Sequence, residues 1–188
     1  KYVDRNGDGV VDDNDRDIIG NPNPDFTYGF QTKVSWKSLS LSASFNGVQG
    51  RDILNVGNRY NNTPGTKSNN VTRKAFQNMW TDENPSNLYP KSTFVVQNMV
   101  MDRYVEDGSY LRCSDITLSY VLPAKWTNKI GIKNTSVYAS VKNAFVITDY
   151  SGYDPEVNSF AFDGLRPGVD MNSYPTPRSF VFGLNLTF

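Results

Sequence analysis

Five segments of the chain alternate strictly between apolar residues and small or polar ones. The pattern is clearest near the C-terminal end. There Phe180, Phe182, Leu184, Leu186 and Phe188 alternate with Val181, Gly183, Asn185 and Thr187. A period of two places the two sets of side chains on opposite faces of a β-strand. A strand whose apolar face meets lipid, and whose last aromatic residue lies at the membrane interface, accounts for this pattern.

The same alternation predicts strands at about 25–35, 39–48, 109–122, 135–147 and 179–188. The other four apolar rows are Phe26, Tyr28, Phe30, Val34 and Trp36; Leu39, Leu41, Ala43 and Phe45; Tyr110, Ile116, Leu118, Tyr120 and Leu122; and Val137, Ala139, Val141, Phe145 and Ile147. The alternate positions are polar or small, so these strands cannot form half of a dry sandwich core. A sheet with one face in water stays possible, but the pattern favours an all-β transmembrane barrel. Aromatic residues near the strand ends agree with the girdles of such a barrel.

The connections between the predicted strands fall into two classes of length. A tight turn at Lys37 and Ser38 and a short segment at about 123–133 join two pairs of strands, whereas the connections at about 48–108 and 148–178 are long. Bacterial barrels have short turns on the periplasmic side and long loops outside the cell. We therefore expect the long connections to be extracellular and the last strand to run toward the periplasm.

Composition excludes several other classes of protein. The chain has 19 basic and 19 acidic residues, so it lacks the basic footprint of a nucleic-acid-binding protein. It contains no run near the roughly 18 apolar residues that a membrane-spanning helix needs. Cys113 is the only cysteine and can form no internal disulfide, and the absence of His excludes a His general base.

The segment before the first predicted strand has the spacing of a calcium-binding loop. Oxygen ligands fall at loop positions 1, 3, 5, 7, 9 and 12, which are Asp4, Asn6, Asp8, the Val10 carbonyl, Asp12 and Asp15. Gly9 stands at the sixth position, where the loop turns sharply. The alternative is a solvated acidic turn. Asn21 to Pro24 cannot continue a helix, so we expect a structural Ca²⁺ clip rather than a regulatory sensor.

Other residues offer weaker candidates for chemistry. The aspartates of the calcium loop are too close together to act as the acid and base of a glycoside hydrolase, and we expect no enzyme activity. Aromatic and amide residues in the long connections could stack on sugar rings or simply pack the loops: Tyr60, Asn61, Asn62, Trp80, Tyr89 and the Tyr150–Tyr153 cluster. Lys33, Lys142 and Asp115 are expected to face the barrel lumen, where they could tune a channel or only solvate the wall.

Motifs spread along the chain resemble one family. The run from Asp4 to Gly20 followed by Asn21–Phe30 resembles the C-terminal part of SusC/RagA-type TonB-linked outer-membrane proteins. The segments Val105–Arg112, Thr117–Pro123, Tyr150–Val157 and Tyr174–Phe188 resemble that part as well, in the same order. The sequence departs from the family at Cys113 to Asp115, where the family more often has an apolar residue, a Lys and an Asn.

This resemblance implies the C-terminal part of a large antiparallel barrel of about 22 strands, plugged by an N-terminal domain. It implies TonB-dependent import of a glycan, oligosaccharide or peptide across the outer membrane of a Gram-negative bacterium, with a SusD-type surface lipoprotein as partner. The TonB complex would act through an N-terminal region outside this sequence, and the last strand with Phe188 would be read by the barrel-assembly machinery.

Five strands cannot close a barrel by themselves, because the smallest bacterial barrels have about eight. We therefore expect residues 1–188 to be the C-terminal portion of a longer barrel, with an extracellular calcium-loop segment at 1–24 and barrel strands and loops at 25–188. The remainder of the same barrel and outer-membrane lipid would be its neighbours. The alternative is a soluble calcium-stabilised binding or adhesion module. A dockerin of that kind would need a second calcium loop and helical periodicity, and this sequence has neither.

Overall fold

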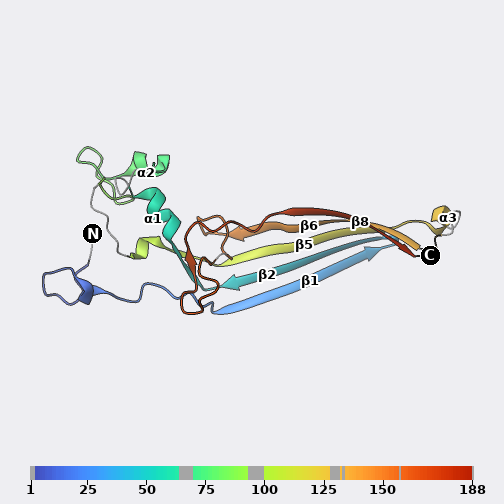
Figure 1. The fold of residues 1–188 in the computed structure, drawn as a ribbon, viewed down its shortest axis with the longest axis horizontal. Coiled ribbons are helices and arrows are strands. Elements are labelled where there is room, and N and C mark those ends of the chain that lie inside the picture. Colours follow the sequence, from blue (N-terminus) through green and yellow to red (C-terminus); the bar gives the residue numbers. More distant parts are fainter. Residues whose placement is uncertain are drawn as a thin grey trace.

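Five long antiparallel strands form one extended sheet in the computed structural model, which describes residues 3–63, 70–92, 100–127, 132, 134–156 and 158–187. The order of strands across the sheet is β1-β2-β5-β6-β8 (Figure 1). Their bounds are β1 Phe26–Trp36, β2 Leu39–Gln49, β5 Tyr110–Val121, β6 Asn134–Thr148 and β8 Ser179–Thr187. All five strands predicted from the alternation are therefore confirmed to within one or two residues, except that Phe188 lies outside the described residues.

Cross-strand pairing places the apolar rows together on one face of this sheet. Phe30 lies opposite Phe45 with the two rings stacked at 4.6 Å, and Leu41 lies between Val34 and Leu118. These side chains are not covered by the rest of the described chain: Phe182 remains 78% exposed. A monomeric soluble protein rarely exposes so continuous an apolar surface.

The opposite face of the sheet is polar. Lys33 pairs with Ser42, Ser42 with Thr117, and Thr117 with Ser140, so one polar row crosses four strands. This two-faced sheet is the form that a wall between lipid and an aqueous lumen requires.

A β-bulge in β5 moves Tyr110 out of the apolar row in which the alternation had placed it. The ladder is irregular between Cys113 and Asp115, and the extra residue, Ser114, donates its hydroxyl to the Ser44 carbonyl at 3.1 Å. One inserted residue moves everything beyond it to the other face. Tyr110 consequently lies opposite Val48 on the polar face, and the prediction that it belongs to the apolar row is wrong.

The two ends of the sheet differ in the way that the connection lengths predicted. The Lys37–Ser38 turn, the short helix α3 (Ala124–Thr127) and the end of β8 lie together at one end (Figure 1). At the other end lie the N-terminal segment and the two long connections. These connections carry elements that the alternation did not predict: β3 Asp52–Asn55, α1 Val56–Asn62, α2 Arg73–Asn78, η2 Asp102–Tyr104, β4 Val105–Asp107 and β7 Val169–Asp170.

The strands β4, β3 and β7 form a second small sheet, and with α1 and α2 they build what we call the loop lobe, residues 50–109 and 149–178. Both helices begin at a side-chain cap: Asn55 accepts from the Asn58 N–H at 2.8 Å, and Thr72 from the Ala75 N–H at 3.2 Å. Several of the buried residues lie where this lobe meets the sheet, among them Ile53 and Tyr150. Among the described residues, no helix has the length and apolar character needed to cross a membrane.

Candidate functional site

The six residues predicted to bind calcium all lie in one closed loop at the N-terminal end of the described chain. The Gly7 and Gly9 N–H groups donate to the two carboxylate oxygens of Asp4 at 2.6 and 2.8 Å. Both glycines have positive φ, +78° and +83°, which other residues rarely adopt. The Arg5 N–H donates to Asp15 Oδ1 at 2.7 Å, so the first and last predicted ligands are brought to the same side of the loop.

The remaining predicted ligands stabilise the turns between these two ends. Asp8 Oδ1 accepts from the Val10 N–H at 2.8 Å, and Asn6 Nδ2 donates to Asp8 Oδ2 at 2.9 Å. The Asp12 side chain caps the turn η1 (Asp13–Asp15), and Asp15 Oδ2 accepts from the Asp12 N–H at 2.9 Å. The Asp12 and Arg5 N–H groups lower the pKa of the Asp15 carboxyl.

The donor set of this loop fits calcium in chemistry, since it consists of carboxylate, amide and carbonyl oxygens on a chain that turns at glycines. Within the described residues no three His, Cys, Asp or Glu side chains converge closely enough to hold a metal ion. In this structure the carboxylates instead accept backbone N–H groups. Calcium binding therefore stays a prediction, and the structure supplies the fold of the loop.

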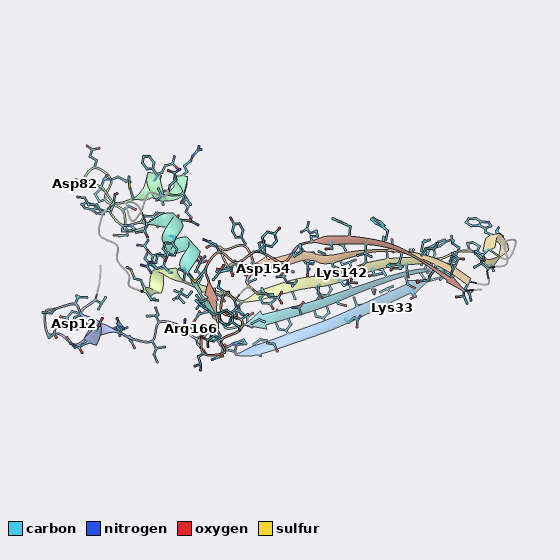
Figure 2. The ribbon with its side chains drawn as sticks, viewed as in Figure 1. Asp12, Lys33, Asp82, Lys142, Asp154 and Arg166 are labelled. Atoms are coloured by element: carbon cyan, nitrogen blue, oxygen red, sulfur yellow. The ribbon has the colours of Figure 1, made fainter. Side chains whose placement is uncertain are left out.

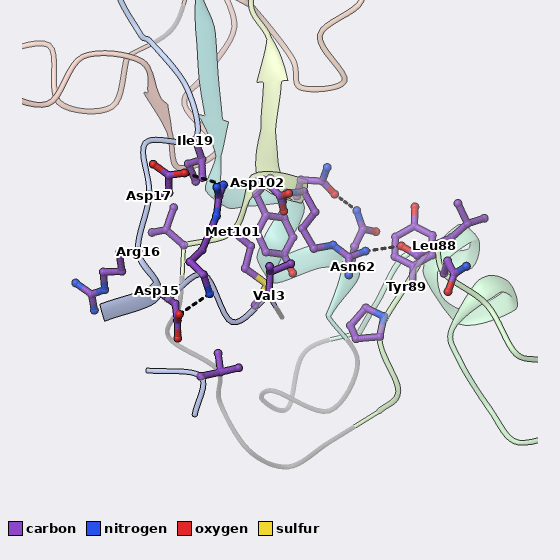
Figure 3. Close-up of a pocket in the computed structure, with 18 of the residues that line it drawn as sticks. Val3, Asp15, Arg16, Asp17, Ile19, Asn62, Leu88, Tyr89, Met101 and Asp102 are labelled. Atoms are coloured by element: carbon purple, nitrogen blue, oxygen red, sulfur yellow. Dashed lines mark hydrogen bonds and ion pairs between the residues drawn. The ribbon is translucent and has the colours of Figure 1, made fainter. Parts of the chain in front are cut away.

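A large open hollow lies between the calcium loop and the loop lobe (Figure 3). It measures about 1300 Å³ and is lined by both charge signs, with Asp15, Asp17 and Asp102 beside Arg16 and Lys74. Tyr89, a predicted sugar-stacking residue, lines it, whereas Trp80 is covered on one ring face by the Lys91 ammonium at 5.1 Å. Among the described residues of its lining, no nucleophile and base are in hydrogen-bond contact.

A buried ion-pair cluster fastens the second long connection to the polar face of the sheet. Arg112 on β5, only 5% exposed, lies 2.5 Å from Asp154 and 2.8 Å from Glu156. Glu156 also accepts from the Tyr110 hydroxyl at 2.6 Å and from Asn46 on β2 at 3.2 Å. We call these five residues the loop clamp, because they join two strands to residues 154–156.

Electrostatics in the loop clamp favour the ion pair. Burial opposes ionisation of Asp154, but the backbone N–H groups of Glu156 and Thr176, together with the Arg112 guanidinium, lower the pKa of its carboxyl. A buried carboxylate paired in this way stabilises the docked loop only while it is charged.

Polar contacts continue from the loop clamp into the loop lobe. Glu106 accepts from Asn55, Asn58 and the Ser151 hydroxyl, the last two at 2.8 and 2.9 Å. The Tyr150 hydroxyl donates to Asp170 at 2.7 Å. Burial of the hydroxyl is the main cause that raises the pKa of Tyr150, and this hydrogen bond is the second. Tyr150 is thus buried and occupied, so it is not available for stacking on a sugar.

Three charged residues of the long strands were also candidates from the sequence. Lys33 and Lys142 lie on the polar face of the sheet (Figure 2). Their partners on the neighbouring strands are Ser42 and Asp115, respectively. Asp115 accepts from Thr117 at 2.7 Å and from Ser140 at 2.8 Å. These residues therefore share the polar face of the sheet, where hydroxyl groups of β5 and β6 hold the Asp115 carboxylate. That this face lines a barrel lumen stays a prediction.

Sequence reasoning missed the roles of Arg112, Asp154 and Glu156. One available signal was their presence in the motifs that carry the family resemblance, which does not show that they meet. The bulge at Ser114, which puts Arg112 on the polar face, did leave a signal: the apolar positions change from odd numbers at Leu111 and Cys113 to even numbers at Ile116 and Leu118.

Comparisons with known proteins agree with this architecture. The chain is 35% identical over 196 residues to TonB-dependent receptor P26 of Formosa agariphila, and 34% identical over 194 residues to TonB-dependent receptor SusC of Bacteroides thetaiotaomicron. The alignments cover all of this chain but only 19% and 17% of those relatives. No family model matches the chain.

Solved structures give the same result for the fold. The structure of the RagAB peptide transporter matches 95% of this chain with a TM-score of 0.79 and 29% identity, and the chain covers 19% of that structure. The RagAB peptide importer in its open-open state matches 91% of the chain with a TM-score of 0.74. The resemblance to the SusC/RagA-type proteins is therefore confirmed over the whole chain, which has the sequence and the fold of a segment of a TonB-dependent receptor barrel.

Proposed function

We propose that this chain is part of an outer-membrane receptor that imports a glycan, an oligosaccharide or a peptide with energy from the TonB complex. The observation that carries the proposal is the antiparallel sheet with an exposed apolar face and a polar opposite face. Its similarity to TonB-dependent receptors and to a peptide transporter supports it.

In this receptor the chain forms part of the barrel wall. β1 and β8 are the edges of the described sheet, each with one neighbour. Unpaired backbone groups in hydrocarbon cost several kcal/mol each, so both edges need strands from elsewhere in the same barrel. We propose that β8 and the following Phe188, which lies outside the described residues, are recognised by the assembly machinery.

The loop lobe and the N-terminal segment would face the outside of the cell in this orientation. A SusD-type surface lipoprotein is the proposed partner there, supported by the similarity to SusC and to the RagAB assembly. We also propose that Asp4, Asn6, Asp8, the Val10 carbonyl, Asp12 and Asp15 bind a structural Ca²⁺, which would order the segment without switching it.

The direct test is energy-dependent uptake by cells that produce the full-length receptor. Outer-membrane fractions should contain the receptor, and accumulation of its nutrient should stop when the TonB protein is deleted. Receptor found in the soluble fraction, or uptake that continues at the same rate without TonB, would contradict the proposed function.

A further inference from the structure

A small polar cavity lies between α1 and the second long connection. It measures about 240 Å³ and is lined by four asparagines of α1 and its cap, and by residues 151–153, 170 and 172. Its described lining includes neither Lys nor Arg and no aliphatic side chain larger than Thr72. We call it the amide pocket.

Hydrogen bonds fix the side chains of the inner wall of the amide pocket. Asn55 and Asn58 donate to Glu106, and the Thr72 hydroxyl donates to Asn62 Oδ1 at 2.5 Å. The one carboxylate of the lining, Asp170, accepts from the Tyr150 hydroxyl and from the Ser173 N–H. The wall is therefore preformed, and its only negative charge is already engaged.

The rim of the pocket has polar side-chain groups that make no hydrogen bond within the described chain. Among the described residues, the side-chain amides of Asn61 and Asn172 and the hydroxyl of Tyr153 have no hydrogen-bond partner. The Tyr153 side chain is 74% exposed beside them. A flat aromatic face and side-chain amides that line the same pocket form a surface to which a ligand can bind.

The position of Asn172 depends on the absence of a side chain at Gly57. A Cβ on Gly57 would lie 2.0 Å from Asn172 Oδ1, so the amide packs directly over the start of α1. Asn172 has a φ of +67°, a left-handed conformation that asparagine tolerates better than most residues. The position of this amide at the pocket thus depends on a glycine at position 57 and on a left-handed backbone at Asn172.

We propose that the amide pocket binds one unit of an uncharged oligosaccharide, with Tyr153 stacked on the sugar ring and the Asn61 and Asn172 amides on its hydroxyl groups. Each amide can donate and accept, as a hydroxyl requires. The described lining supplies no Lys or Arg for the terminal carboxylate of a peptide and, apart from the Tyr153 ring, no large apolar side chain to contact those of a peptide. This proposal rests on the proposed import function and selects the substrate class.

The test uses the purified full-length receptor, an array of uncharged oligosaccharides and a pool of short peptides. Binding to at least one uncharged oligosaccharide is expected. The variants Tyr153→Ala, Asn61→Ala and Asn172→Gly should each weaken it about threefold to tenfold. Glycine at position 172 keeps the positive φ accessible. Tyr174→Ala, also highly exposed but not part of the lining, is the matched control and should change nothing.

The outcomes separate the pocket from the import function. Binding to peptides alone, no binding to any oligosaccharide of the array, or equal losses in all four variants would overturn the amide-pocket proposal. Uptake of the bound oligosaccharide by cells is measured in parallel. If binding behaves as expected but uptake does not depend on TonB, the import function fails and the pocket stands.

Discussion

The sheet exposes its largest apolar side chains, whereas the loop lobe buries charged ones. On β8 Phe182 is 78% exposed, while Asp154 and Asp170 of the loop lobe are each 2% exposed. The described sheet does not cover its own apolar face or pair its own edges, and we propose that lipid and further strands of the barrel do so. The loop lobe, by contrast, has partners for these charges within the described chain: Asp154 pairs with Arg112 of β5, and Asp170 accepts from the Tyr150 hydroxyl.

Removing one member of the loop clamp should have the largest effect. Asp154→Ala leaves Arg112 buried without its closest carboxylate, and we expect the docking of residues 149–178 to lose about 3–5 kcal/mol. Hydrogen exchange of the full-length receptor should show lost protection in this segment while β1 and β2 stay protected. The Asp163→Ala variant, whose ion pair with Arg166 is more exposed, is the control and should have little effect. Equal loss of protection in the sheet would show that the two regions are one cooperative unit.

Charge on the apolar face should have the next largest effect. Leu41→Arg, in the middle of β2, should cost roughly 2–4 kcal/mol of barrel stability in lipid, because the guanidinium would face hydrocarbon. Ser42→Arg points to the polar face and should be nearly neutral. Denaturant unfolding of the receptor in lipid vesicles measures both, and similar costs at the two positions would remove the distinction between the faces.

Acid should loosen the loop lobe before it affects the sheet. The pKa of Asp154 is lowered in the folded chain, so its ion pair stabilises docking above the ordinary aspartate value of about 3.9. This contribution is lost as the pH falls below that value and through the lowered pKa. Hydrogen exchange corrected for its intrinsic pH dependence should show residues 149–178 opening in this range. Opening that is already complete at pH 6 would exclude Asp154 as the cause.

Calcium should have the smallest and most local effect. Titration of the receptor with Ca²⁺ should protect residues 3–20 from proteolysis, and bound oxygens should lie at about 2.3–2.6 Å in a structure with the ion. Asp8→Asn should weaken the binding, whereas Asp17→Asn, outside the predicted ligand set, should leave it almost unchanged. Protection that appears equally without Ca²⁺ would contradict the structural clip.

The sheet was more predictable from sequence than the loop lobe, for a physical reason. Alternation is a local property, so it located all five long strands and the polar positions of Lys33 and Lys142. Strands β3, β4 and β7 have only two to four residues, too few for a period to show.

The loop clamp depends on contacts that sequence pattern does not encode. Arg112 and Asp154 are 42 residues apart, and they meet only because the bulge at Ser114 turns Arg112 to the polar face. The calcium loop is the opposite case: its fold is determined by closely spaced aspartates and glycines, so its ligand set could be predicted even though the ion itself is still to be tested.

The central claim is that one face of the sheet meets lipid and the other the lumen. The most direct measurement places a fluorescent label at position 184 or 185 of β8 in the full-length receptor, through Leu184→Cys or Asn185→Cys with Cys113→Ala, in vesicles containing a lipid-borne quencher. Leu184 lies on the apolar face and Asn185 on the polar one. The label at 184 should be quenched strongly by the lipid quencher, and the label at 185 only by a water-soluble one. Equal quenching at both positions, or the reverse order, would contradict the account.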